Sequence, residues 1–123
     1  MAAQSFVDSL GVTGRTAEDG TATLELDATD RHLNPAGTVH GGLLATLVDT
    51  AMGQAIRSRT GEDDVPATSQ LTVTYLRPGR PGRLVATGRV SKQGEHLTVC
   101  EADVEQDGRT LVHAVATFAV LHH

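Results

Sequence analysis

The sequence predicts an α+β fold in which one long central helix is wrapped by a curved antiparallel β-sheet of five to six strands. A single apolar segment, from about residue 40 to residue 59, is long enough for about five helical turns. Strand-like segments lie on both sides of it. The pairs Gln93-Gly94 and Asp107-Gly108 separate the last of these strands, and such pairs are typical of tight hairpins. One helix beside many antiparallel strands is typical of a layered α+β domain.

Length and composition restrict the classes of protein that fit. With 123 residues the chain is expected to form a single domain, residues 1–123, with enough length for a sizeable core. Fifteen acidic against ten basic residues give a net charge of −5, which does not favour a nucleic acid partner. The aromatic residues are Phe6, Tyr75 and Phe118, so the core must consist mainly of Leu, Val and Ala.

The termini and the single cysteine bear on location. Residues 1–5 lack the basic and apolar regions of a signal peptide, and no apolar stretch reaches the length of a membrane span. Cys100 has no partner for an internal disulfide and is expected to be a small apolar residue in a strand. We therefore expect a cytoplasmic protein with no membrane partner. His122 and His123 are either native residues or the remnant of a tag, and no chemistry is assigned to them.

Short elements are expected before the helix and long strands after it. Residues 5–10 predict a helical turn that Gly11 closes, and the alternation of Ala22, Leu24 and Leu26 with polar residues is typical of a half-buried strand. The last three strands should form an antiparallel meander. The other expected segments are strands at 12–17 and 21–26, a loop at 27–39, an acidic loop at 60–64, and strands at 67–76, 83–91, 96–105 and 110–121.

The predicted helix carries one carboxylate, Asp49, two turns inside an otherwise apolar segment. Such an acid is costly unless it has a partner or a function. A helix that is apolar on nearly all sides is expected to be buried on most of them, with the stripe around Asp49 left for the close approach of a strand or a ligand. On a helical wheel that stripe holds mostly small residues, namely Gly42, Ala45, Thr46, Gly53 and Ile56.

A polar, glycine-rich turn at residues 34–42 leads directly into this helix. Backbone N–H groups at a helix start attract negative charge, so an acid and a set of amide donors can act here on one polarised group. Each residue also has a purely structural interpretation. Asn34 is a turn former, His40 is a helix-start residue that donates to a nearby carbonyl, and Gly41 permits close packing. Asp49 fits a structural hydrogen-bond network as well as a functional acid.

The pattern Asn34-x-x-Gly37-Thr38-x-His40-Gly41-Gly42, followed by Leu47-Val48-Asp49, resembles the signature of the hotdog-fold acyl-CoA thioesterases, most closely their PaaI-like branch. The likeness is specific over the turn and the helix. It continues more loosely through Thr68 and residues 74–78 to the C-terminus. The resemblance implies a long helix wrapped by an antiparallel sheet of five or six strands, in agreement with the pattern of elements above.

The resemblance also implies roles for individual residues. Asp49 matches the catalytic acid, either as general base on water or as nucleophile toward the thioester carbon. Gly41 matches the backbone N–H that polarises the thioester oxygen, and Asn34 matches a side chain that helps to hold the thioester. Thr68 falls where the family carries a Ser or Thr that orients the water, and His40 has at most a supporting role. No cofactor is implied beyond the coenzyme A that the substrate carries.

Spacing along the helix adds a constraint on assembly. Gly41 and Asp49 are eight residues apart, which is about 12 Å along a helix axis. One thioester cannot touch both, so if both act, the amide and the acid must come from different protomers. A two-fold dimer with antiparallel, facing helices would hold two such sites. We therefore expect an obligate homodimer, which can pair further into a tetramer, and the resemblance implies the same.

Arg77, Arg80 and Arg83 are spaced around Pro78 and Pro81 and form a local basic cluster on an acidic chain. Such a cluster can bind the phosphates of coenzyme A. For any one of these arginines, a solvated turn is the simpler interpretation. No Gly-x-Ser-x-Gly, His-Glu-x-x-His or paired Cys-x-x-Cys pattern occurs, so neither a serine hydrolase elbow nor a metal site is expected.

These observations favour an acyl-CoA thioesterase that releases a free acid and coenzyme A. Two alternatives remain, namely a hotdog enoyl-CoA hydratase or dehydratase with His40 as acid or base, and a non-catalytic acyl-CoA binding module. The nine-residue separation of His40 from Asp49 disfavours the hydratase. The complete set of motif residues disfavours the binding module. The sequence leaves the acyl group open between an aryl-acetyl group and a medium-length aliphatic chain.

Overall fold

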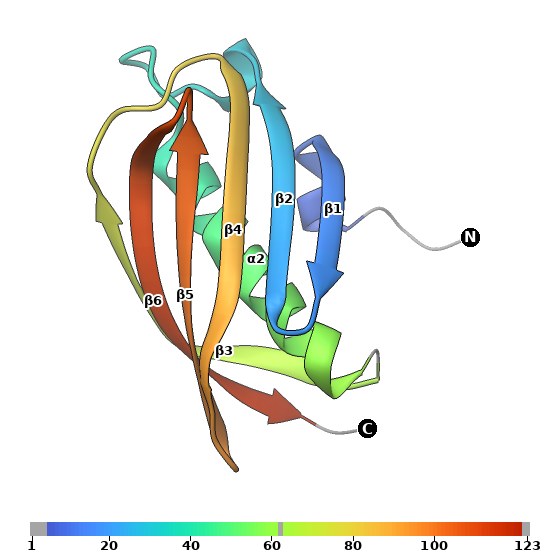
Figure 1. The fold of residues 1–123 in the computed structure, drawn as a ribbon. Coiled ribbons are helices and arrows are strands. Elements are labelled where there is room, and N and C mark those ends of the chain that lie inside the picture. The colour runs from blue at the N-terminus through green and yellow to red at the C-terminus, as the bar shows by residue number, and fades with distance from the viewer. Residues whose placement is uncertain (1–4, 62, 122–123) are drawn as a thin grey trace.

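The computed structural model describes residues 5–61 and 63–121 and confirms the α+β fold, with one long helix and a six-stranded sheet. Figure 1 shows the sheet curved around helix α2, which lies against its concave face. The elements in chain order are α1 (Phe6–Ser9), β1 (Val12–Glu18), β2 (Thr21–Ala28), the 3₁₀ helix η1 (Asp30–His32), α2 (Gly41–Thr60), β3 (Val65–Tyr75), β4 (Gly82–Gln93), β5 (Leu97–Gln106) and β6 (Arg109–Leu121).

All strand pairs are antiparallel, and the order across the sheet is β1-β2-β4-β5-β6-β3. Strands β4, β5 and β6 form the expected meander. Strand β3 lies at the far edge and pairs with β6 alone, from Val65 opposite Leu121 to Tyr75 opposite Val112. In the described part of the chain, β1 and β3 are therefore the two edges of the sheet.

Several elements extend beyond their predicted limits. Strand β2 continues through Ala28, so the predicted loop at 27–39 is shorter and contains η1. Helix α2 has His40 as its N-cap and ends at Thr60. The expectations on residues 1–4, on Glu62 of the acidic loop and on the two terminal histidines lie outside the described residues. Within the described ranges, no helix combines the length and the apolar character needed to cross a membrane.

The core lies between the concave face of the sheet and one face of α2. Cys100 points into it from β5 as a fully buried free thiol, as expected for a small apolar residue. Burial raises the pKa of this thiol to about 11, so it stays protonated and unreactive. The buried face of α2 consists of Leu43, Leu44, Leu47, Val48, Ala51, Met52, Ala55 and Ile56.

Gly88 on β4 allows α2 to approach the sheet closely. A Cβ at this position would lie 2.6 Å from the carbonyl carbon of Ala51 and 2.6 Å from the nitrogen of Met52. These are backbone atoms, which cannot give way as the end of a flexible side chain can. The glycine therefore sets how closely the middle of the helix packs on the sheet.

The face of α2 that carries Asp49 is not covered by the sheet. Ala45, Asp49 and Gly53 are only half-buried, as a stripe left for another partner requires. Ile56, which the helical wheel placed in the same stripe, is buried. Two expectations are thus corrected for the single chain: α2 is covered mainly on one side, and Asp49 is not enclosed by apolar side chains. The reason is that the sheet curves around one side of the helix and ends at its β1 and β3 edges.

The convex face of the sheet carries a charged network across three strands. Asp103 on β5 accepts hydrogen bonds from Nδ1 of His113 at 2.8 Å and from Nη2 of Arg89 at 3.0 Å. Partial burial favours the neutral acid, but the two hydrogen bonds and the neighbouring positive charge outweigh it and hold the pKa of Asp103 below its usual value. The network connects β4, β5 and β6 on the side away from α2.

The close approach at Gly88 predicts a large effect of a single methyl group. Gly88→Ala should lower the free energy of unfolding by about 1–3 kcal/mol, because the helix must move away from the sheet to relieve the contact. The measurement is urea denaturation at one fixed protein concentration. Gly14→Ala on β1 is the matched control, since its Cβ would meet only the flexible carboxylate end of Glu25. Equal midpoints for the two variants would contradict this account of the packing.

The Asp103 network predicts a pH-dependent stability. A carboxyl whose pKa is lowered on folding stabilises the folded state above its unfolded pKa, about 3.9, and loses this effect as the pH falls through the folded value. Asp103→Asn should therefore lower the free energy of unfolding by about 1 kcal/mol at pH 7. The difference from the parent protein should shrink below about pH 4. Denaturation from pH 3 to pH 7 tests this, with exposed Glu105→Gln on the same strand as the control. A deficit that persists unchanged at pH 3 would show that lost packing, and not charge, causes it.

Candidate active site

The ring of His40 caps the N-terminus of α2. The Gly42 N–H donates to Nδ1 of His40 over 2.8 Å, and the N–H groups of Leu43 and Leu44 donate to the His40 carbonyl. The ring therefore accepts from an amide, which corrects the expectation that it donates to a carbonyl. Its Nδ1 must be unprotonated to accept this bond. His40 thus holds the first turn of the helix in shape.

Gly41 is the first residue of α2, and its N–H is available. Among the residues that the structure describes, no group accepts a hydrogen bond from this N–H, which is usual for the first turn of a helix. The Gly41 carbonyl accepts a hydrogen bond from the Tyr75 hydroxyl at 2.7 Å. Because Tyr75 is the last residue of β3, this bond fixes the helix start relative to the edge strand.

Tyr75 is a site residue that the sequence reasoning missed. It entered only as part of the loose likeness over residues 74–78. Its ring lies so close to the helix start that a Cβ on Gly41 would lie 3.3 Å from its hydroxyl oxygen. The signal that was available in the sequence is a lone tyrosine in a chain with few aromatic residues, within the segment that resembles the family.

Asn34 shapes the loop before α2. Its Oδ1 accepts from the N–H groups of Ala36 at 2.9 Å and Thr38 at 3.2 Å, and its Nδ2 donates to the Thr38 hydroxyl at 2.8 Å. These bonds confirm that it forms the turn. The second hydrogen of Nδ2 can still be offered to another acceptor, so the turn and a contact to a thioester are compatible.

Asp49 and Thr68 are brought together from α2 and β3. The Thr68 hydroxyl donates to Oδ1 of Asp49 at 2.7 Å. Strand β3 is irregular at this point, because Thr68 pairs with Phe118 and Gln70 with Thr117, which leaves Ser69 as an extra residue. Such a bulge redirects the side chains beside it. The acid therefore has a hydroxyl partner while its other oxygen remains at the open face.

Gly41 and Asp49 line different pockets of the single chain. Gly41 lies with Asn34 and Tyr75 in a pocket of about 320 Å³. Asp49 lies with Thr68 in a pocket of about 280 Å³. The two pockets share no residue. The structure thus places the amide donor and the acid in two separate pockets, the candidate half-sites, and does not join them within one chain.

The predicted basic cluster is rearranged. Arg77 and Arg80 line a pocket of about 560 Å³ together with Arg109, which the sequence reasoning did not include. Arg83 does not line this pocket, because its guanidinium is bonded to the carboxylates of Glu25 and Asp27 on β2. Gln106 orders the turn beside the pocket, since its side chain accepts from the Arg80 N–H at 2.9 Å and donates to the Arg80 carbonyl at 2.7 Å.

The described residues contain no cluster of three or more His, Cys, Asp or Glu side chains that could hold a metal ion. The groups present at the half-sites are a carboxylate, a hydroxyl and a free backbone amide. A carboxylate can remove a proton from water or attack an electrophilic carbon, and an amide at a helix N-terminus can stabilise a developing oxyanion. Together these groups fit acyl transfer to water.

Comparison with known proteins agrees with this chemistry. The model of the thioesterase superfamily matches residues 36–113. Human acyl-coenzyme A thioesterase 13 is 35% identical over 105 residues, which cover 83% of this chain and 74% of that protein. The acyl-coenzyme A thioesterase PaaI of Escherichia coli is 32% identical over 97 residues, which cover 78% of this chain and 67% of that protein.

Comparison with solved structures gives the same family. A protein of Streptococcus mutans, solved with acetyl-CoA bound, superposes with a TM-score of 0.81 at 26% sequence identity over 91% of this chain and 88% of that one. The matched region contains Gly41, Asp49 and Thr68, whereas Asn34 lies just before it. The chain belongs to the thioesterase superfamily, in its PaaI-like hotdog branch, and is a thioester hydrolase.

Proposed function

We propose that this protein hydrolyses acyl-CoA thioesters in a site that two copies of the chain build together. The observation that carries the proposal is the separation of the two half-sites. The free Gly41 amide and the Asp49 carboxylate lie on one rigid helix, about 12 Å apart along its axis, in pockets with no common residue. A single thioester meets both groups only when they belong to different chains.

The groups have complementary roles in the reaction. The Gly41 N–H binds the thioester oxygen and stabilises the negative charge that forms there when the carbonyl carbon is attacked. Asn34 can donate its remaining amide hydrogen to the same region. Asp49 takes a proton from water as the new carbon–oxygen bond forms, or attacks the carbon itself and is then released by water. The carbon–sulfur bond breaks, and the coenzyme A thiolate receives the proton.

Thr68 has a defined place in this scheme. Its hydroxyl hydrogen is already given to Asp49, so its oxygen is left as an acceptor. A water that donates one hydrogen to Thr68 and the other to the second oxygen of Asp49 would be held by two fixed groups. Thr68 therefore orients the attacking water. His40 supports the site by capping the helix through its Nδ1, which accepts from the Gly42 N–H.

The surface around Asp49 supports a dimer. The open face of α2 carries the small residues Ala45 and Gly53, which allow another backbone to approach closely. Beside it, β3 is an eleven-residue edge strand that is paired on one side only within the described chain. Long unpaired edges are usually covered in stable proteins. A two-fold contact through this face brings the acid of each copy to the helix start of the other, and such dimers can pair further into tetramers.

The pocket of Arg77, Arg80 and Arg109, called the basic pocket from here on, favours coenzyme A as the carrier of the acyl group. The pocket of Gly41 and the pocket of Arg80 and Arg109 are contiguous, because both include Arg77 and Pro78. If the arginines bind the phosphates there, the thioester lies at the helix start. The bound acetyl-CoA of the Streptococcus mutans protein supports this assignment. The reaction needs only water as co-substrate, so no cofactor is proposed, and the free thiol of Cys100 agrees with a reducing cytoplasm.

The amide and the acid can be tested separately. Gly41→Pro removes the N–H at the first helical position, where proline is tolerated, and Gly41→Ala adds a Cβ but keeps the N–H. Thiol release from acyl-CoA should fall about 10²- to 10³-fold in Gly41→Pro and much less in Gly41→Ala. The rate of thiol release should fall in Asp49→Asn by at least the same factor as in Gly41→Pro. Equal activity of the two glycine variants would remove the amide from the mechanism.

The same assay distinguishes the other function classes. An unsaturated acyl-CoA that gains water without releasing thiol would indicate a hydratase. Tight binding of acyl-CoA without any turnover, in protein with an intact Asp49, would indicate a binding module. Single-turnover hydrolysis in ¹⁸O water tests for direct attack by Asp49, because the label enters the aspartate when water opens the resulting acyl-aspartate anhydride at the aspartyl carbon.

A complementation experiment tests the composite site. Asp49→Asn and Gly41→Pro homodimers are each expected to be inactive, because both of their sites lack one group. A mixed dimer has one site with both groups and one with neither. Random mixing of the two variants by co-expression should therefore restore about one quarter of the parent activity. No recovery in mixed dimers of verified composition would place amide and acid in the same chain.

A further inference from the structure

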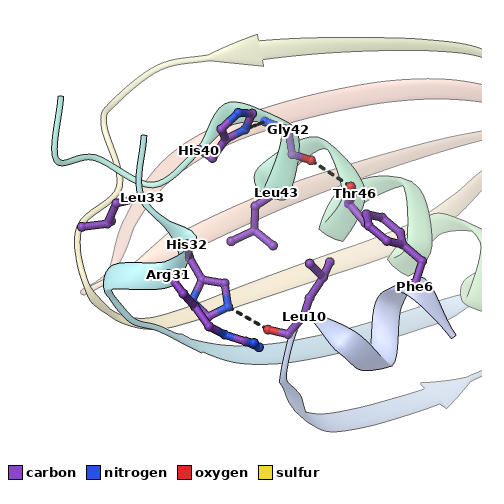
Figure 2. Close-up of a pocket in the computed structure, with 9 residues that line it drawn as sticks. All are labelled: Phe6, Leu10, Arg31, His32, Leu33, His40, Gly42, Leu43 and Thr46. Carbon is purple, nitrogen blue, oxygen red and sulfur yellow. Dashed lines mark hydrogen bonds between the residues drawn. The ribbon is translucent and has the colours of Figure 1, made fainter. Parts of the chain in front are cut away.

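A third pocket lies on the opposite side of the helix start from the basic pocket. It has a volume of about 360 Å³ and is formed between α1, η1 and the first turns of α2. Figure 2 shows Leu10 and Leu43 pointing toward each other across it, with the ring of Phe6 beside Thr46. Leu33 lines the end near the loop that precedes α2. This volume is within the range of small-molecule sites.

The polar side chains around this pocket are bound to the protein itself. His32 is buried and connects the start of η1 to the end of α1. Its Nδ1 accepts from the Thr29 N–H at 2.9 Å, and its Nε2 lies 2.7 Å from the Leu10 carbonyl oxygen. Arg31 donates to the Ser9 carbonyl at 3.0 Å. These bonds attach α1 to η1 and hold the pocket open. Arg31 and His40 also line the pocket and use only part of their hydrogen-bonding capacity in these bonds, but the surface that the pocket offers a ligand is mainly apolar.

The helix start separates this apolar pocket from the basic side. Gly41 and Leu44 line the pocket that continues to Arg77, whereas Gly42 and Leu43 line the apolar pocket. Successive helical residues differ in direction by about 100°, so neighbours in the first turn can serve two different sides. The Gly41 amide, where the thioester oxygen is proposed to bind, lies at the division between them.

We infer that the pocket of Phe6, Leu10, Leu33 and Leu43 holds the acyl group of the substrate, and that this group is an apolar chain or ring longer than acetyl. The inference rests on the proposed function. An acyl-CoA is charged on one side of its thioester and apolar on the other, and the protein has the same distribution on the two sides of Gly41. With the nucleotide at Arg77, Arg80 and Arg109, the acyl group extends toward α1.

Phe6 on the short helix α1 completes the pocket at its rim. Its side chain is 68% exposed, which is unusual for one of only three aromatic residues in the chain. An acyl chain in the pocket would cover part of this ring and withdraw both from water. The short helix is thus retained by His32 and Arg31 as a wall for the acyl group, although it buries no residue of its own.

The test is the dependence of hydrolysis on the acyl group. The substrates are saturated acyl-CoAs from acetyl to decanoyl, with phenylacetyl-CoA as an apolar ring and glutaryl-CoA as a chain with a charged end. For the parent protein, kcat/KM should rise about fourfold for each methylene group that enters the pocket and then level off. The kcat/KM for glutaryl-CoA should be at least tenfold lower than that for pentanoyl-CoA, which has the same chain length without the second carboxylate.

Two variants link this profile to the pocket. Leu10→Trp fills it and should reduce kcat/KM for octanoyl-CoA about 10²-fold more than kcat/KM for acetyl-CoA. Phe6→Ala removes only an exposed side chain, so folding should be unaffected. Its kcat/KM for octanoyl-CoA should be about fivefold lower than that of the parent protein. The control is Leu97→Trp at the start of β5, an exposed leucine that does not line the pocket, and it should leave the profile unchanged.

The outcomes separate this inference from the proposed function. If the parent hydrolyses acyl-CoAs but Leu10→Trp and Phe6→Ala keep the parent profile, the acyl group binds elsewhere and only the inference is wrong. If Leu10→Trp does not fold, an unchanged profile of Phe6→Ala alone is sufficient to reject it. A preference for glutaryl-CoA would also overturn it, because the charged end would require Arg31.

If the parent hydrolyses no acyl-CoA at all, both proposals fail. A change of oligomeric state in Leu10→Trp, with the profile retained, would assign the pocket to contact with another copy.

Discussion

The fixed rise of α2 is the constraint on which the rest of the structure depends. A helix cannot shorten the distance of about 12 Å between residues eight positions apart, and here those positions carry the free amide and the carboxylate. The packing of the helix makes this separation permanent, because Gly88 brings its middle close to β4 and its aliphatic face is buried. Any chemistry that uses both groups must therefore recruit a second chain. The half-buried face around Asp49 is the surface that remains for it.

The sequence predicted the elements of this fold because their signals are local. The turn pairs at 93–94 and 107–108 specify the meander, and the apolar run specifies α2. The position of Asp49 opposite the buried face followed from helical periodicity alone. Ile56 was misplaced because a wheel treats the helix as isolated, whereas the sheet curves under its C-terminal turns and buries this residue. The depth of Asp49 could not be predicted for the same reason, since it depends on where the sheet ends.

Contacts between strands that are distant in sequence were the part that could not be predicted. Arg83 was grouped with Arg77 by proximity along the chain, but the register of β4 against β2 places it beside Glu25 and Asp27. Arg109 joined the basic pocket because β6 begins next to the turn after β3. Tyr75 reaches Gly41 only because β3 lies at the sheet edge nearest the helix start. Each of these depends on strand order, which the sequence pattern left undefined.

The same helix start explains why binding and catalysis can be divided between its two sides. Its amide is held in place, because His40, Tyr75 and the loop of Asn34 bind the backbone around it. A fixed donor stabilises a developing charge without reorganisation. In the proposed reaction, specificity depends on the side chains on either side of this donor, which are arginines toward β6 and leucines toward α1. Under this proposal, the side chains on either side can vary without disturbing the donor, so the same helix start can serve substrates that differ in the acyl group.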